Sequence, residues 1–203
     1  MNRRIEDEPG CKMRIRIVHD SDPEQPGDDL VKISYATRSR YVLGTEAVTE
    51  DQAWELGERM KHGCLVGIPV YAYVHSGSTV RCSENGNLFD CPWDSGRSGL
   101  AYIDMPKVVA EFGEGPEAIE KAKVRIRSAV ELFDVWLRGE VYGFVAETWS
   151  PVYDKAGETV GGIWVAEDCC QGFYGDDWRT NGIKDYVREY LDRGFELRED
   201  LYR

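Results

Sequence analysis

Three reactive side chains lie near the middle of this sequence. Cys91, His75 and Asp94 supply a thiol, an imidazole and a carboxylate. A cysteine nucleophile needs these groups as the attacking atom, its base and the group that orients the base. A small cysteine beside Pro92, packed under Trp93, explains the same residues without catalysis. We favour this second interpretation, so the three residues are catalytic candidates only, and binding is expected rather than enzymatic activity.

Cysteine also suggests a second kind of chemistry, which is metal binding. The chain has six cysteines, but none are spaced as Cys-x-x-Cys. Structural zinc usually takes two closely spaced pairs of ligands. A zinc site here would have to combine His75, Cys82, Cys91 and Cys169 from distant parts of the chain. Half-buried cysteines on strands explain the same positions, so we predict no metal and no cofactor.

Four short segments combine hydroxyl, aromatic and acidic side chains with glycine, and each ends an apolar, strand-like run. They read HSGS, CPWDSG, GEVYGFV and GFYGDDW, at residues 75–78, 91–96, 139–145 and 172–178. Polar tips beside glycines that permit close backbone approach suit a binding site at the rim of a sheet. The expected binding residues are Trp93, Asp94, Ser95, Tyr142, Glu147, Phe173, Tyr174, Asp176 and Asp177.

The acidic residues of this set are the expected exposed contact points. They are Asp94, Glu147 and the adjacent pair Asp176 and Asp177. Adjacent acids in loops are often simply solvated. This pair has aromatic neighbours on both sides, however, and such an arrangement suits a basic groove or the face of a nucleotide base.

One glycine-rich stretch resembles a phosphate-binding loop only in composition. Residues 96–99 read GRSG and lack the Gly-Lys-Ser/Thr ending of such loops. The stretch also opens an expected strand, whereas a phosphate loop opens a helix. We therefore assign it no phosphate-binding role from the sequence.

The charge of the chain narrows the classes of partner. The 203 residues include 37 acidic and 25 basic side chains, for a net charge of -12. Binding to nucleic-acid phosphates or to an anionic membrane needs a basic face, so neither is expected. Two interpretations remain. One is an ordinary acidic surface that maintains solubility, and the other is a surface that mimics nucleic acid in the basic groove of a partner.

The apolar pattern predicts an α+β fold with a mainly antiparallel sheet of six to eight strands and three or four helices. Apolar residues alternate along residues 12–19, which indicates a strand. Thr49 and Gln52 form the pattern of a helix capping box, and Pro116 opens the longest helix. We expect a flexible leader at residues 1–10 and a single domain at residues 11–203.

The first residues lack the apolar core of a signal peptide, and no apolar run approaches the ~20 residues of a membrane span. We therefore expect a cytoplasmic protein with reduced cysteines.

The joint occurrence of the HSG, CPWDSG, GEVYGFV and GFYG segments resembles a family of functionally unassigned proteins of bacteriophages and mobile elements. The similarity covers about residues 69–177. The family has no assigned catalytic residues to transfer to this chain. The resemblance implies an accessory protein acting in an infected or element-bearing bacterial host.

Together these observations lead to one expected function and two alternatives. The expected function is binding and inhibition of a host defence complex, either a restriction enzyme or a CRISPR nuclease, through an acidic surface. The first alternative is a small hydrolase or nucleotide-binding protein with a Cys/His site. The second is a structural or assembly protein, for which a large exposed apolar patch is expected.

Overall fold

The computed structural model describes residue 6 and residues 9–198, and its chain divides into two compact units. Unit 1 comprises Met1–Glu24 and Glu140–Arg203, and unit 2 comprises Gln25–Gly139. Each unit has its own hydrophobic core. This division differs from the single domain expected from the sequence. One crossing lies in a loop at residues 20–31 that contains Pro23, Pro26 and Gly27, and the other lies in a short turn at residues 138–140.

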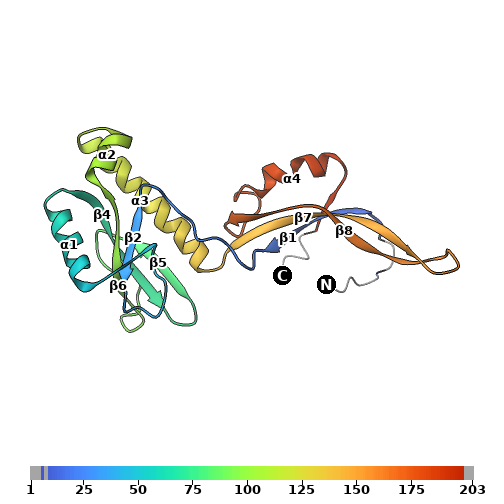
Figure 1. Ribbon diagram of the computed structural model, residues 1–203, viewed down its shortest axis with the longest axis horizontal. Helices are drawn as coiled ribbons and strands as arrows, with labels where there is room; N and C mark the ends of the chain where they lie inside the picture. Colours follow the sequence, from blue (N-terminus) through green and yellow to red (C-terminus); the bar gives the residue numbers. More distant parts are fainter. Residues whose placement is uncertain (1–5, 7–8, 199–203) are drawn as a thin grey trace. The chain divides into compact units, whose positions relative to one another are not determined.

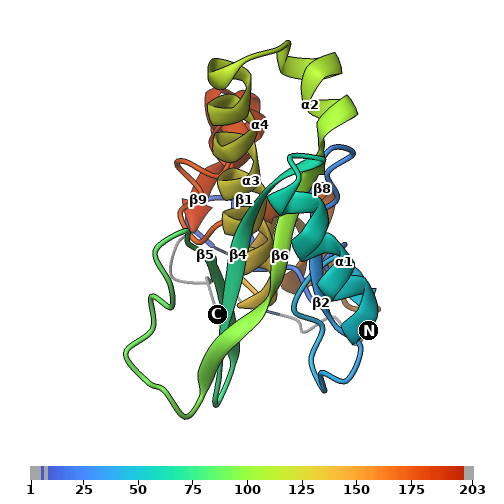
Figure 2. The same ribbon diagram turned by 90° about the vertical axis from the view of Figure 1, so that its left-hand side faces the viewer.

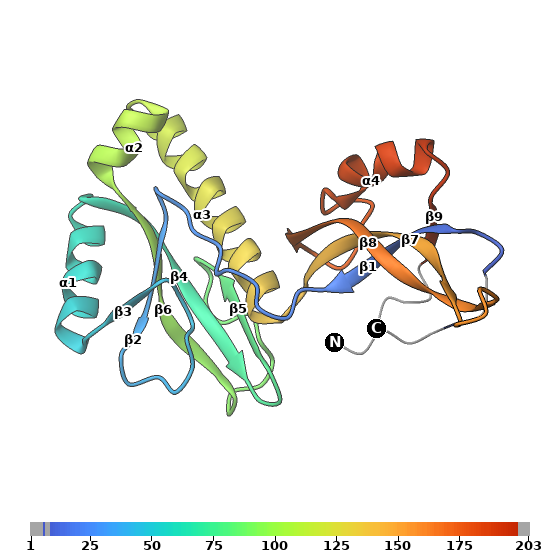
Figure 3. The same cartoon turned by 45° about the vertical axis from the view of Figure 1, so that its right-hand side comes forward.

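Unit 2 contains a five-stranded sheet with the strand order β3-β2-β6-β4-β5. The strands are β2 (Lys32–Ala36), β3 (Glu46–Val48), β4 (Leu65–Val74), β5 (Ser78–Cys82) and β6 (Ser95–Asp104). The helices are α1 (Glu50–Lys61), α2 (Met105–Phe112) and α3 (Pro116–Leu137). The strands of this sheet run between α1 and α3 (Figure 3).

The two faces of this sheet are covered to different extents. On one face, Ile126 and Phe133 of α3 pack against Ile68 and Ile103 of the sheet, and all four side chains are almost fully buried. On the other face, α1 contributes a single buried side chain, Leu56. Figure 2 shows α1 over one part of this second face. Much of the second face is therefore not covered by a helix.

The first turn of α1 forms as the sequence predicts. The Gln52 amide donates to Thr49 Oγ1 at 3.3 Å, and the Thr49 amide donates to Gln52 Oε1 at 2.8 Å. This reciprocal pair is a capping box, which satisfies two amides that the helix leaves unpaired. After the helix, Gly63 adopts a φ of 69°, a conformation that favours glycine.

Unit 1 contains a four-stranded sheet with the order β8-β7-β1-β9. Its elements are β1 (Met13–His19), β7 (Val141–Tyr153), β8 (Thr159–Tyr174), α4 (Ile183–Asp192) and β9 (Glu196–Arg198). Helix α4 covers one face of the sheet (Figure 1). Ile15 and Ile17 of β1 join Ile183 and Val187 of α4 in the core. The alternation predicted for β1 therefore corresponds to a buried and a more polar face.

The fold class predicted from the sequence is confirmed. The described residues form nine strands and four helices, and only the pairs β1–β9 and β2–β3 are parallel. The strand count slightly exceeds the predicted range because β3 and β9 have three residues each, too few to show a pattern. Of the expected leader, residues 1–5 and 7–8 lie outside the described residues, while Glu6 pairs with Gly162 in an antiparallel bridge.

Among the described residues, no helix combines the length and apolar character that a membrane crossing requires.

Candidate functional site

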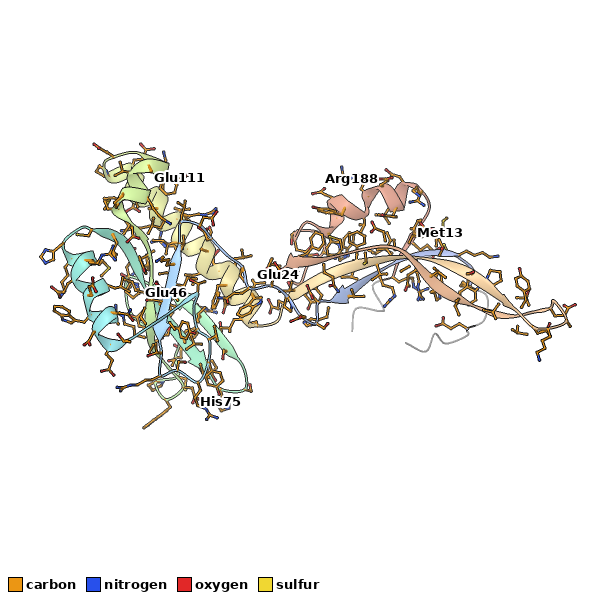
Figure 4. All side chains as sticks on the ribbon, viewed as in Figure 1. Met13, Glu24, Glu46, His75, Glu111 and Arg188 are labelled. Atoms are coloured by element: carbon orange, nitrogen blue, oxygen red, sulfur yellow. The ribbon has the colours of Figure 1, made fainter. Side chains whose placement is uncertain are left out.

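The structure brings together the three reactive side chains that the sequence singled out. His75 follows β4 and Asp94 precedes β6, and the Val74 amide donates to the Asp94 carbonyl at 2.8 Å. The Asp94 carboxylate lies 3.2 Å from His75 Nδ1 and 3.6 Å from Cys91 Sγ. Figure 4 labels His75 near one end of the strands of unit 2.

The order of the three groups differs from that of a cysteine nucleophile. In such a site the imidazole lies between the thiol and the acid, so that it can accept the thiol proton. Here Asp94 lies between them, and no hydrogen bond joins Cys91 to His75 within the part of the chain that is described. The thiol donates to the carboxylate instead. The contacts therefore do not form a complete catalytic set.

The surroundings of Cys91 also differ from the non-catalytic interpretation. Trp93 is 93% exposed, so Cys91 is not packed beneath it. Ser95 Oγ donates to the Cys91 carbonyl and accepts from Asn87 Nδ2 at 2.8 Å. Backbone and hydroxyl contacts hold this turn, which leaves Trp93 in solvent.

The cysteines proposed as weak zinc ligands are divided between the two units. Cys82 lies on β5 and packs against the core of unit 2, where burial raises the pKa of its thiol. Cys91 belongs to unit 2, whereas Cys169 lies on β8 of unit 1. Within residue 6 and residues 9–198, no group of three or more His, Cys, Asp or Glu side chains is arranged to hold a metal ion.

The expected binding residues Tyr142 and Tyr174 lie together at the end of the unit 1 sheet. Tyr142 meets His19 edge to face, with ring centroids 5.6 Å apart. Burial, followed by the charges of Asp176 and Glu140, raises the pKa of Tyr142. Tyr174 donates from its hydroxyl to the Glu24 carbonyl at 2.7 Å. Both phenols are half-buried, so they shape this end of unit 1 rather than project from it.

Glu147 is not an exposed contact point, because it is only 7% exposed. Its carboxylate accepts from Arg14 Nε at 2.7 Å and from Arg16 Nε and Nη2 at 2.9 Å each. Burial acts to raise the pKa of Glu147, but the hydrogen bonds from Arg16 and Arg14 outweigh it and lower the pKa. The Arg14 guanidinium also lies 3.8 Å from the ring centre of Trp164. Glu147 therefore has a structural role in the face opposite α4.

Phe173 also lies inside unit 1 rather than on a binding surface. It is 9% exposed and packs near Phe144, with ring centroids 6.3 Å apart. Tyr186 of α4, which is 60% exposed, meets Phe173 at 5.2 Å in an edge-to-face contact. The aromatic side chain available at this position is therefore Tyr186, which the sequence analysis did not select.

Asp176 and Asp177 are exposed and begin a larger acidic region around α4. We call this region the α4 surface, and its carboxylates are Glu167, Asp168, Asp176, Asp177, Asp185, Glu189 and Asp192. Asp168 belongs to it because it accepts from the hydroxyl of Tyr190 on α4, at 2.5 Å. That hydrogen bond, with smaller contributions from burial and the Asp168 charge, raises the pKa of Tyr190 to about 12.

The α4 surface keeps a negative excess after its ion pairs are considered. Its basic residues are Arg179, Lys184, Arg188 and Arg193, four against seven carboxylates. Arg193 pairs with Glu167 at 3.1 Å, and Arg188 pairs with Asp185 at 3.2 Å. Figure 4 shows Arg188 on the side of α4 that faces away from the sheet.

The uncovered face of the unit 2 sheet forms a second candidate site, which the sequence analysis did not identify. A groove of about 750 Å³ runs between α1 and the sheet. Ser34 and Ala36 of β2 and Arg97 of β6 line its floor, and Trp54 and Gly57 of α1 line its wall. Trp54 and Gly57 lie in the helix that the Thr49 capping box predicts. A tryptophan and a glycine on that helix were the only sequence signal for this groove.

Comparisons with the models of known protein families, with curated proteins and with solved structures found no match for this chain.

Proposed function

We propose that this protein is an accessory binding protein that inhibits a nucleic-acid-processing defence complex, such as a restriction or CRISPR nuclease, through the α4 surface. Two further features support this. Unit 1 contains 20 acidic and 12 basic residues and unit 2 contains 17 and 13, so their net charges are -8 and -4. The three catalytic candidates also lack the order that nucleophilic catalysis requires.

The observation that carries the proposal is the position of two carboxylates at the carboxyl end of α4. The last turn of α4 contains Glu189 and Asp192 and no basic residue. The helix dipole disfavours negative charge at this end by about 0.3–1 kcal/mol per residue. Arg193 at the C-cap places one cation at this end, and it pairs with Glu167 at 3.1 Å, so the helix end does not explain both acids. Acids placed where the helix dipole disfavours them, without a gain in structure, are typical of a functional surface.

The chemistry of the α4 surface fits a basic groove. Tyr186 offers a large exposed ring among the carboxylates, and tyrosine is enriched among residues that dominate binding energy. Carboxylates around such a ring would compete with nucleic-acid phosphates for the arginines and lysines of a nuclease. Association through charge would be fast at low salt and slower as salt rises.

The proposal is tested by measuring DNA cleavage by purified restriction and CRISPR nucleases in the presence of the protein. The decisive variant combines Glu189→Gln and Asp192→Asn, with Glu111→Gln and Glu114→Gln in unit 2 as the control for an equal change of charge. We expect the first pair to lose inhibition and the second pair to keep it. Inhibition that survives both pairs and high salt would overturn the proposal.

A further inference from the structure

We infer that the groove of unit 2 binds a nucleoside monophosphate, with its base against Trp54 and its phosphate on Arg97. This site belongs to unit 2 and does not depend on the α4 surface, so either proposal can fail without the other. Its volume of about 750 Å³ lies within the range of about 300–1,000 Å³ typical of small-molecule sites.

The groove is open because its two sides carry small side chains. Ser34, Ala36 and Ser98 line the floor beside Gly99, so a ligand can approach the backbone of the sheet. On the wall, a Cβ atom added at Gly57 would have no heavy atom within 4 Å. Glycine within a helix is less favourable than alanine. Packing does not require a glycine at this position, and its small size keeps this part of the groove wall open.

Most of the charge in the groove is neutralised within the protein. Arg38 pairs with Glu50 at 2.9 Å, and Lys61 pairs with Glu58 at 2.5 Å. Asp51 lies in the first turn of α1, where the helix dipole favours an acid.

Arg97 is the exception. It is exposed on the floor of the groove, and no described residue makes a hydrogen bond or an ion pair with its guanidinium. A guanidinium of this kind suits the oxygens of a phosphate group, which it can bind through two parallel hydrogen bonds.

Trp54 supplies the second recognition element. Its side chain is 70% exposed on the groove wall, and no described ring or cation stacks on it. An indole face suits a flat heteroaromatic ring, because nucleic-acid bases stack on aromatic side chains. A stacking surface and one cation in the same groove define a ligand with a planar ring and an anionic group.

The acids of the groove limit how much negative charge the ligand can carry. Three basic and three acidic side chains line the groove, so its formal charge is balanced. One phosphate can replace water around Arg97, but a triphosphate would also meet the repulsion of Glu50, Asp51 and Glu58. This balance favours a monophosphate.

The inference is tested by titrating the full chain with AMP, GMP, CMP and UMP in a calorimeter. We expect saturable binding of at least one of them, and weaker binding of the matching nucleoside and of inorganic phosphate. The variants Arg97→Gln and Trp54→Leu each remove one proposed contact. Loss of a hydrogen-bonded charge weakens binding by about tenfold or more, and loss of the stack by about fivefold or more.

Matched controls separate the groove from the rest of the surface. Arg40→Gln removes the same charge, and Tyr153→Leu removes another exposed aromatic ring, and neither residue lines the groove. Both controls should bind the nucleotide as the parent protein does. Gly57→Leu should block binding while keeping Arg97 and Trp54, because leucine favours a helix and its side chain enters the groove.

Three results would overturn the inference. The first is no saturable binding of any of the four monophosphates at millimolar concentration. The second is equal loss of binding in the control variants. The third is tighter binding of a short peptide containing Phe and Asp than of any nucleotide, which would make the groove a peptide site.

Discussion

Replacing Glu147 with glutamine should destabilise unit 1 more than any other conservative change to an acidic residue there. The Glu147 side chain is 9% exposed, and its carboxylate accepts three hydrogen bonds from Arg14 and Arg16. Glutamine keeps the shape and one acceptor oxygen, but it removes the negative charge and places an NH2 group against a guanidinium. Two cations then remain close together, partly out of water.

The size of the effect follows from the exposure of the three side chains. Breaking a buried ion pair by removing one partner costs about 3–5 kcal/mol. The Arg14 and Arg16 side chains are 15% and 30% exposed, so Arg16 in particular can recover some hydration. We therefore expect the free energy of unfolding of unit 1 to fall by about 3 kcal/mol for Glu147→Gln, at the lower end of that range.

Hydrogen exchange measured by mass spectrometry is the suitable assay, since it reports opening of β1 and β7 separately from unit 2. Glu158→Gln is the control, because Glu158 is exposed near the turn between β7 and β8, and such changes usually stay within about 0.5 kcal/mol. A loss below about 1 kcal/mol for Glu147→Gln would refute the reasoning, because desolvation of the pair would then offset its attraction.

The same cluster predicts a pH dependence with a definite sign. Burial raises the pKa of Glu147, but the hydrogen bonds from Arg16 and Arg14 bring it below its usual value of 4.5. A lowered pKa in the folded state contributes stability above pH 4.5 that is lost as the pH falls through the folded value. Unit 1 of the parent protein should therefore lose more stability on acidification than the Glu147→Gln variant, and equal slopes would contradict the assignment.

Three further results are expected. Gly57→Ala should raise the free energy of unfolding of unit 2 by about 1 kcal/mol in chemical denaturation, because alanine favours a helix and has open space there. Gly99→Ala should lower it by about 3 kcal/mol or more, because the new Cβ would lie 1.7 Å from the Ser34 carbonyl oxygen. The hydrogen bond to Asp168 raises the pKa of Tyr190 to about 12, so the stability it contributes below pH 10 should be lost as the pH rises toward 12.

Each of these has a control within the chain. Gly96→Ala lies on the same strand as Gly99 with nothing within 4 Å of the new Cβ, so it should have little effect. Equal losses at both glycines would remove the steric explanation. Tyr190→Phe is the control for the loss of stability at high pH, and it should reduce the loss in unit 1 between pH 10 and 12. If stability depends on pH in the same way in this variant, the loss belongs to other groups.

Local features of the fold were predictable from the sequence, because neighbouring residues determine them. The alternation in β1, the capping box at Thr49 and the start of α3 at Pro116 all appear in the structure. β3 and β9 were missed because three residues are too few to show periodicity. β8 runs to Tyr174 along a stretch with an irregular exposure pattern, which the alternation of a half-buried strand does not predict.

The candidate sites were less predictable because they depend on contacts between distant residues. Glu147 is separated by 133 residues from Arg14, so its burial could not be inferred from its neighbours in sequence. The cluster of His75, Cys91 and Asp94 was found because its members are close along the chain. The order of contacts within this cluster could not be predicted, because it depends on how the end of β4 and the start of β6 meet. The groove joins Trp54 of a helix to Arg97 of a strand, and neither residue marks a site alone.

Along the sequence, unit 2 is inserted between the two segments that form unit 1, and this order affects how the chain folds during synthesis. Met13 pairs with Thr148 and His19 pairs with Tyr142, so the sheet that contains β1 can form only after β7 has been synthesised. Unit 2 is one continuous stretch between them and can complete its own sheet first. The first strand thus emerges long before its partner, and its alternating arginines keep that waiting segment charged and resistant to pairing with other chains.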